Sequence, residues 1–296
     1  MGMINQIKRL DAKKSGLHVV DDNELTKLKA TLLDMLKDLI DVFDTNDIQW
    51  SLSGGSIIGA VRHHGFIPWD DDIDLFMTRK NFEKFKKIFN QQLGGKYRLR
   101  LPGDDGYILH FPTIEKLGTK IKPVQSAEGT QGLFIDIFIL ENAPDNAVLR
   151  MLHGLRSTAY LAIDSFVRTE ACKKNLLKYG ASSPELIKAV KLRCRLSKIF
   201  QFRKMEKWMF LSDKCFSSVK NDHSEYVVCP SGGAHYFGEI FKREYLEKTI
   251  KTDFEDIKAN IPCNSDYYLT KRYGADYMTI PQDAAKERHT YIEFEL

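Results

Sequence analysis

Two short apolar runs in this 296-residue chain carry carboxylates at positions where a buried strand normally carries none. One run is Asp72-Ile-Asp-Leu-Phe-Met77, and the other is Phe134-Ile-Asp-Ile-Phe138, which lies within the apolar stretch 133–140. A near-continuous apolar run of this length is typical of a central strand that is buried on both faces. A carboxylate inside such a strand is costly unless it is hydrogen-bonded, paired or bound to a cation. The two runs therefore predict a sheet with acidic groups in its interior strands.

The spacing of the acids in the first run indicates what they bind. Residues i and i+2 of a strand point to the same face, so we expect Asp72 and Asp74 to project together. Two aligned carboxylates favour a hard cation such as Mg²⁺ (or Mn²⁺), which commonly takes one or two carboxylates together with substrate phosphates. Asp70 and Asp136 would complete the set. The alternatives are a solvated acidic loop and, for Asp136, a structural carboxylate hydrogen-bonded to backbone.

A glycine turn precedes the acidic run. Gly54, Gly55 and Ser56 follow an expected strand at 48–53 and open an expected short helix at 57–63. Glycine lets the backbone approach a ligand, and a helix N-terminus offers unpaired N–H groups to a phosphate. Such junctions are also common in proteins where no ligand binds, so the turn alone does not identify a phosphate site.

The remaining pattern alternates helices with strands. Apolar residues at helical spacing predict a helix at 24–43 with Asp22 or Asn23 as its N-cap, and Thr78 is expected to cap the helix that follows the first acidic run. Further expected elements are strands at 97–101, 107–111 and 225–229, and helices between 146 and 220, one of them starting at Pro184.

Composition excludes several classes of protein. A content of 43% hydrophobic and 28% charged residues is that of a globular protein, not of a disordered or fibrous one. No apolar stretch approaches the roughly 20 residues that span a bilayer, and the N-terminus lacks a signal-peptide core, so we expect a cytoplasmic protein. The five widely spaced cysteines favour reduced thiols over a zinc site or a disulfide framework.

The charge is concentrated in the middle of the chain. Residues 150–220 hold sixteen Lys and Arg against five Asp and Glu, although the whole chain has a net charge of only +4. A basic stripe recurs at helical spacing beside an apolar one: Lys188, Lys191, Arg195 and Lys198 beside Leu192, Leu196 and Ile199. We therefore expect residues 186–204 to contact an anionic membrane peripherally; the alternative is a solvated helix face. No nucleic-acid module is recognisable, so no nucleic-acid partner is expected.

A close resemblance to the LicD family of phosphocholine (more broadly, phosphodiester-forming) transferases runs through Gly59-Ala-Val-Arg-His-His-Gly-Phe-Ile-Pro-Trp-Asp-Asp-Asp-Ile-Asp-Leu75. It continues in Phe134–Phe138 and, more loosely, in Tyr236–Glu239, Phe254–Asp256 and Tyr273–Pro281. The resemblance implies a polymerase-beta-like nucleotidyltransferase fold of class α/β (α+β), with a mixed sheet flanked by helices. It also implies a catalytic core at 20–145, a basic helical insertion at 146–222, and a mixed C-terminal region at 223–296 that completes the catalytic unit.

The resemblance also implies an activity, which is metal-dependent transfer of phosphocholine from CDP-choline to a sugar hydroxyl of a cell-surface glycan, with release of CMP. The acceptor would be a precursor of teichoic acid, capsule or lipopolysaccharide, lipid-linked at the inner face of the cell membrane. Matched site residues are Asp72 and Asp74 as the metal pair, Asp136 as the third carboxylate, Asp70 as an additional acid, Gly54, Gly55 and Ser56 as the phosphate-side turn, and Arg62 as a basic residue after it.

Several alternatives remain at this stage. Within the same fold, the enzyme would transfer another phospho-alcohol, such as phosphoribitol, from a CDP donor, or a nucleotidyl group from a nucleoside triphosphate. A non-catalytic relic that binds anions is disfavoured, because a dead site has no reason to keep three costly acids. For Arg62, the alternative to a phosphate contact is a surface ion pair with a nearby Asp. Some relatives carry a lysine near the position of Thr113, so a phosphate contact here would come from elsewhere, for example from Lys116.

Overall fold

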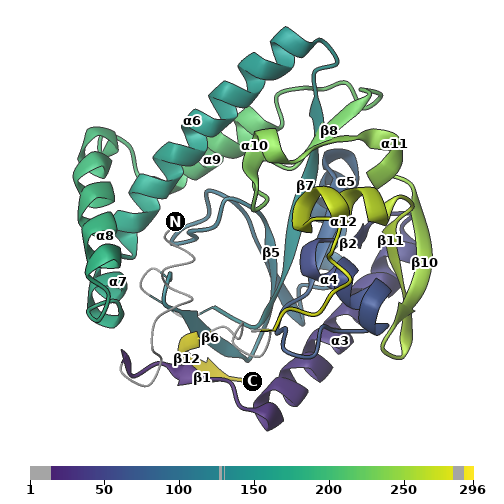
Figure 1. Cartoon of the computed structure of the whole chain (residues 1–296), viewed down its shortest axis with the longest axis horizontal. Helices are drawn as coiled ribbons and strands as arrows, with labels where there is room; N and C mark the ends of the chain where they lie inside the picture. Colours follow the sequence, from purple (N-terminus) through teal and green to yellow (C-terminus); the bar gives the residue numbers. More distant parts are fainter. Residues whose placement is uncertain (1–14, 127–128, 130, 283–289) are drawn as a thin grey trace.

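A mixed β-sheet forms the centre of the molecule in the computed structural model, which describes residues 15–126, 129, 131–282 and 290–296 (Figure 1). Its main path runs in the order β2-β3-β7-β5-β4, and β3 and β7 are parallel while the other neighbours are antiparallel. These strands are β2 (Ser51–Leu52), β3 (Asp74–Thr78), β7 (Phe134–Ala143), β5 (Thr113–Lys116) and β4 (Tyr97–Arg100). The predicted α/β class with a mixed sheet is confirmed.

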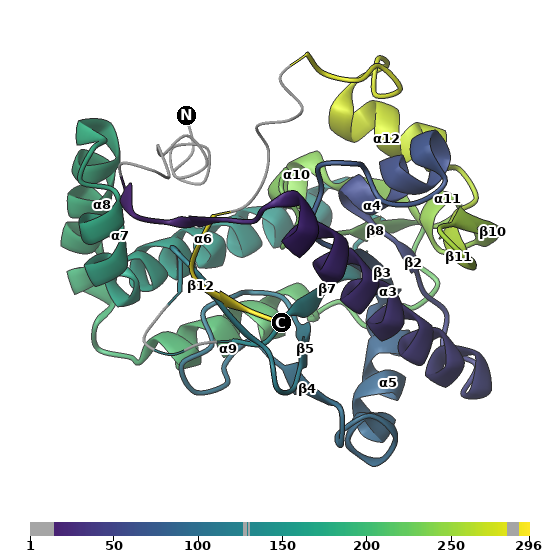
Figure 2. The same ribbon diagram turned by 90° about the horizontal axis from the view of Figure 1, so that it is seen from below.

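The C-terminal part of the chain extends this sheet. The far end of β7 pairs with β8 (Tyr226–Val228), which in turn pairs with β9 (Ile240–Lys242). Among the described residues, two smaller sheets are not hydrogen-bonded to it. One is the hairpin β10 (Thr249–Phe254) and β11 (Ile257–Pro262), and the other joins β1 (His18–Val19), β12 (Thr290–Glu295) and β6 (Lys120–Pro123). Strands from near both ends of the chain thus lie side by side, as Figure 2 also shows.

Helices flank the sheet. Within the described residues, the helices outside the basic segment are α3 (Asp22–Thr45), α4 (Gly54–Ile58), the π-helical turn η1 (Gly59–His63), α5 (Arg79–Gln92), α10 (His235–Gly238), α11 (Arg243–Leu246) and α12 (Ser265–Tyr273). The helix predicted at 24–43 is confirmed as α3, whose apolar face is buried in the main core. Its cap is Asp21, one residue before the expected ones, because Asp21 and Glu24 form a reciprocal capping box.

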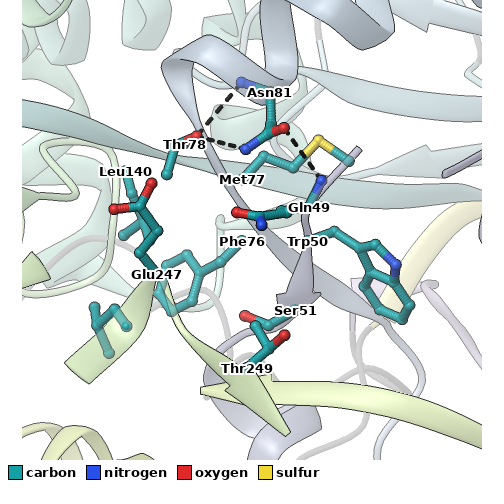
Figure 3. Close-up of a pocket in the computed structure, with 11 residues that line it drawn as sticks. Gln49, Trp50, Ser51, Phe76, Met77, Thr78, Asn81, Leu140, Glu247 and Thr249 are labelled. Carbon is teal, nitrogen blue, oxygen red and sulfur yellow. Dashed lines mark hydrogen bonds between the residues drawn. The ribbon is translucent and has the colours of Figure 1, made fainter. Parts of the chain in front are cut away.

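The start of α5 follows the prediction. The Thr78 hydroxyl accepts a hydrogen bond from the backbone N–H of Asn81, so Thr78 caps the helix. The Asn81 side chain also donates to Thr78 Oγ1 at 2.9 Å and accepts from the backbone N–H of Gln49 at 3.1 Å. Figure 3 shows these bonds as dashed lines. These bonds tie the beginning of α5 to the segment that leads into β2.

Some expected elements were misplaced. The prediction of a strand at 107–111 is wrong. The strand that pairs with β4 is β5, at residues 113–116. The physical reason is the buried Tyr107, whose hydroxyl bonds the carbonyl of Phe111 and Oγ1 of Thr113 and so holds this segment in an irregular turn. The strand expected from residue 72 begins at Asp74, the strand expected at 48–53 is limited to 51–52, and the short helix starts at Gly54.

The basic segment is helical, as predicted. It consists of α6 (Ala147–Ala171), α7 (Lys173–Tyr179), α8 (Pro184–Ser197), the 3-10 turn η2 (Lys198–Phe200) and α9 (Met205–Phe216), and it lies at one side of the sheet (Figure 1). α6 packs against both α8 and α9. Pro184 occupies the first turn of α8, with Ser183 as its cap. Within the described part of the chain, no helix combines enough length and apolar character to cross a bilayer. The division into three domains stays a prediction.

Candidate active site

The sheet register brings two predicted acids together. Asp74 on β3 and Asp136 on the parallel β7 are directly paired, and Asp136 is also paired with Thr113 on β5. Paired residues of neighbouring strands point to the same face, and both aspartates are partly exposed, whereas Ile135 and Ile137 on the opposite face of β7 are fully buried. The two carboxylates therefore share one accessible face of the sheet.

The loop before β3 adds three more carboxylates. Oxygens of Asp70, Asp71 and Asp72 lie within 4.8 Å of one another, close enough to be ligands of one metal ion. Asp71 is buried and accepts a hydrogen bond from the Tyr291 hydroxyl at 3.1 Å. Sequence reasoning did not select Asp71 as a site residue. Its place between two selected acids was the available signal, but its contact with the C-terminal strand β12 was not readable from the sequence.

These five residues are called the acidic cluster below, and repulsion among them is strongest at Asp74. Burial raises the pKa of Asp74 well above its ordinary value, and the charges of Asp72, Asp136 and Asp70 raise it further. Carboxylate oxygens at ligand spacing, beside a carboxyl whose ionisation is opposed by desolvation and by its neighbours, fit a hard divalent ion such as Mg²⁺ or Mn²⁺. The residues therefore suit the expected metal, whose binding stays a prediction.

The glycine turn makes room for the acidic cluster. A Cβ atom on Gly54, where φ is +54°, would lie 2.9 Å from Asp74 Oδ2, and one on Gly55 would lie 3.1 Å from Asp70 Oδ2. The Ser56 hydroxyl accepts a hydrogen bond from the backbone N–H of Asp74 at 3.0 Å. The structure thus gives these three residues a supporting role for the carboxylates, and their predicted contact with phosphate stays a prediction.

Two basic side chains considered for phosphate binding are engaged elsewhere. Arg62, on η1, donates to the carbonyl of Tyr277 at 2.7 Å and to Nε2 of His63 at 2.9 Å, and its guanidinium lies over the Trp69 ring. It makes no ion pair with a described aspartate. The ammonium of Lys116 lies over the Tyr97 ring, and the side chain is on the face of β5 opposite to Thr113.

Phenol groups border the acidic cluster. Although 41% of Tyr273 is exposed, its hydroxyl lies 3.6 Å from the position that a Cβ on Gly54 would take. Desolvation raises the pKa of Tyr273; Arg272 opposes this rise, and the charges of Asp74, Asp70 and Asp72 increase it. Tyr107 is buried and bonds Thr113, which is paired with Asp136, and desolvation and the charge of Asp136 raise the pKa of Tyr107. Neither tyrosine was predicted as a site residue.

A mixed sheet with acids on two paired strands and a glycine turn before the first is the arrangement expected of a phosphotransferase of the nucleotidyltransferase type. Residues 47–148 match the family described as LicD/FKTN/FKRP, nucleotidyltransferase domain. The resemblance to the LicD family that the sequence motifs predicted is confirmed over this segment.

Individual relatives show how far the resemblance extends along the chain. The chain is 29% identical over 245 residues to the lipopolysaccharide cholinephosphotransferase LicD of Haemophilus influenzae, and the match covers 82% of this chain and 86% of that protein. Shorter matches link it to uncharacterized proteins of Rickettsia typhi (36% over 76 residues, 25% of this chain and 24% of that protein) and Rickettsia prowazekii (34% over 70 residues, 23% and 26%).

Proposed function

We propose that this enzyme transfers phosphocholine from CDP-choline to a sugar hydroxyl of a cell-surface glycan, with CMP as the leaving group. The glycan is a precursor of lipopolysaccharide, teichoic acid or capsule. The observation that carries the proposal is the acidic cluster, in which Asp74 and Asp136 are paired across β3 and β7 beside three carboxylates at ligand spacing. The activity named for the Haemophilus relative supports the choice of group transferred.

The residues suit this chemistry. Phosphoryl transfer needs in-line positioning and neutralisation of the charge on the phosphate oxygens. A divalent ion held by Asp72 and Asp74, with Asp70 and Asp71 beside them, would supply that neutralisation when bound. Asp136 stands on the same face of the sheet, so it can accept the proton of the acceptor hydroxyl or act as a further metal ligand.

The reaction products test the donor. We expect CMP as the nucleotide product and phosphocholine on the acceptor when the protein is incubated with CDP-choline, Mg²⁺ and acceptor glycan. We also expect CDP-choline to be preferred over CDP-ethanolamine by about tenfold or more in kcat/KM, because three methyl groups add apolar surface and suit aromatic neighbours such as Tyr273.

Other products would point to other enzymes. Equal use of the two donors, or a preference for CDP-ribitol, would remove the choline assignment and leave the phosphotransferase. Pyrophosphate release from CTP, with cytidylyl groups on the acceptor, would show nucleotidyl transfer instead and overturn the proposal.

We also propose that residues 186–204 contact an anionic membrane surface. A membrane-bound acceptor would bring the enzyme to such a surface. The four basic residues of the predicted stripe are all exposed. Leu192 and Ile199 are 59% and 66% exposed beside them, and Phe202 is 70% exposed. α6 adds a second apolar surface with no acidic residue between 147 and 163, formed by Val148, Leu149, Met151, Leu152 and Leu155, each at least 50% exposed.

Charge reversal tests this contact. Replacing all four basic residues of the stripe (Lys188, Lys191, Arg195 and Lys198) by Glu should weaken binding to anionic vesicles at least tenfold, since each basic residue contributes about 1 kcal/mol near such a surface. The measurement is vesicle co-sedimentation at low and high salt, since salt screens the attraction. The control reverses exposed lysines elsewhere (Lys80, Lys84, Lys87 and Lys251). Wild-type protein that shows no salt-sensitive binding would contradict the contact.

A further inference from the structure

One arginine of the basic segment is turned toward the catalytic core. Arg168, near the end of α6, donates from Nη1 to Nδ1 of His110 at 3.2 Å. Among the described residues it makes no ion pair with a carboxylate, although Asp164 one turn earlier attracts it. Asp164 is a weak counter-charge, because burial raises its own pKa to about 7. A half-buried guanidinium thus lacks a strong anionic partner.

His110 holds this arginine in place without neutralising it. Desolvation and the charges of Arg168 and His235 lower the pKa of His110 to about 3, so its ring is neutral. The ring also has a hydrogen bond with the backbone of Ser231, and its Nδ1 accepts from Arg168. The imidazole therefore orients the guanidinium and links α6 to the loop at 230–235.

Two more basic groups lie around the same loop. His235 has an unusual left-handed φ of +55°, and burial followed by the charges of Arg168 and Arg272 lowers its pKa. Arg272 Nη2 would be 2.8 Å from a Cβ on Gly233, and its Nε is 3.2 Å from the buried Glu239. Two guanidiniums and a histidine therefore lie around this loop, and among the described residues the one carboxylate that forms an ion pair with any of the three is Glu239. A bound anion would relieve this excess of positive charge.

The three side chains Arg168, His235 and Arg272 lie next to the acidic cluster. Arg272 immediately precedes Tyr273, whose phenol is affected both by Arg272 and by the aspartates. A second link runs through Phe111, the residue after His110. The centroid of its ring lies 4.8 Å from that of the Phe138 ring. Phe138 is two residues beyond Asp136 on β7, so it lies on the face of the sheet that carries the acids.

We propose that Arg168, His235 and Arg272 form an anion subsite that binds a phosphate group of the substrates beside the acidic cluster. The inference deepens the proposed function and rests on it for the nature of the phosphate, which belongs either to the CDP donor or to a phosphorylated acceptor. It assigns to the helical segment a direct part in the active site. It also supplies the phosphate contact that neither Arg62 nor Lys116 is placed to make.

Arg168→Ala and Arg168→Lys test the subsite, with Arg156→Ala as the matched control on an exposed part of the same helix. Charge-assisted hydrogen bonds of this kind correspond to about 10- to 100-fold in affinity. Calorimetric binding of CDP-choline in the presence of Mg²⁺ should weaken by that factor in Arg168→Ala, recover in part in Arg168→Lys and stay unchanged in Arg156→Ala. Unchanged donor affinity with a tenfold higher KM for the acceptor would assign the subsite to the acceptor's phosphate.

A second readout separates this proposal from the choice of donor. Inorganic pyrophosphate should raise the melting temperature of the wild type, and less so that of Arg168→Ala, even if CDP-choline is not the substrate. If Arg168→Ala fails to fold, His235→Asn replaces it, since Asn tolerates a left-handed backbone. Variants that keep wild-type affinity for CDP-choline and pyrophosphate, and wild-type KM for the acceptor, would overturn the subsite.

Discussion

Replacing Asp74 by Asn is expected to lower kcat by about three orders of magnitude or more while the fold survives. The amide has nearly the same shape as the carboxylate but no charge to hold a divalent ion. Burial and three neighbouring aspartates already oppose ionisation of Asp74, so removal of its charge relieves repulsion. The bond from its backbone N–H to Ser56 is kept. We therefore expect a melting temperature equal to or above that of the wild type.

The measurement is CMP release as a function of Mg²⁺ concentration, with Asp72→Asn as a companion variant. Asp253→Asn is the control, because Asp253 is an exposed aspartate of β10 that pairs with Lys258 at 2.5 Å. The control should keep wild-type kcat. Full activity of both Asp72→Asn and Asp74→Asn at saturating Mg²⁺ would contradict the site assignment.

Arg79→Ala is expected to reduce the free energy of unfolding by about 3–5 kcal/mol, because it leaves a buried carboxylate without its partner. Arg79 starts α5 and donates to Glu141 of β7, which is 2% exposed, and to Asp213 of α9 at 2.7 Å. Burial alone would lower the pKa of Arg79, but Glu141 and Asp213 raise it above its ordinary value. The arginine thus joins the central sheet to the basic helical segment.

Urea denaturation measures this loss. Arg98→Ala is the control, because Arg98 is exposed and lies 4.0 Å from Glu115, so it should cost less than about 1 kcal/mol. The double variant Arg79→Ala/Glu141→Gln should recover part of the lost stability, since it no longer buries an unpaired charge. A loss below 1 kcal/mol in Arg79→Ala would mean that water or another cation compensates Glu141.

Local pattern was enough for much of the fold. The apolar spacing of residues 24–43 predicted α3, and Thr78 was recognised as a cap because capping depends on neighbours three residues away. The same local logic failed for residues 107–111, where the buried hydroxyl of Tyr107 overrides an extended pattern. Asp72 was expected in the strand but precedes it, although its charge still raises the pKa of Asp74.

The sequence by itself indicated Asp72, Asp74 and Asp136, though not Asp71, because carboxylates inside apolar runs leave few structural explanations other than a cation or a hydrogen bond. The pairing of Asp74 with Asp136 follows from strand order, which the sequence only implied through its resemblance to a known family. The tertiary structure alone decided that Tyr291 reaches Asp71 and that Arg168 reaches His110. Such contacts join residues 220 and 58 positions apart, and no local periodicity encodes which distant side chains will meet when separate elements pack.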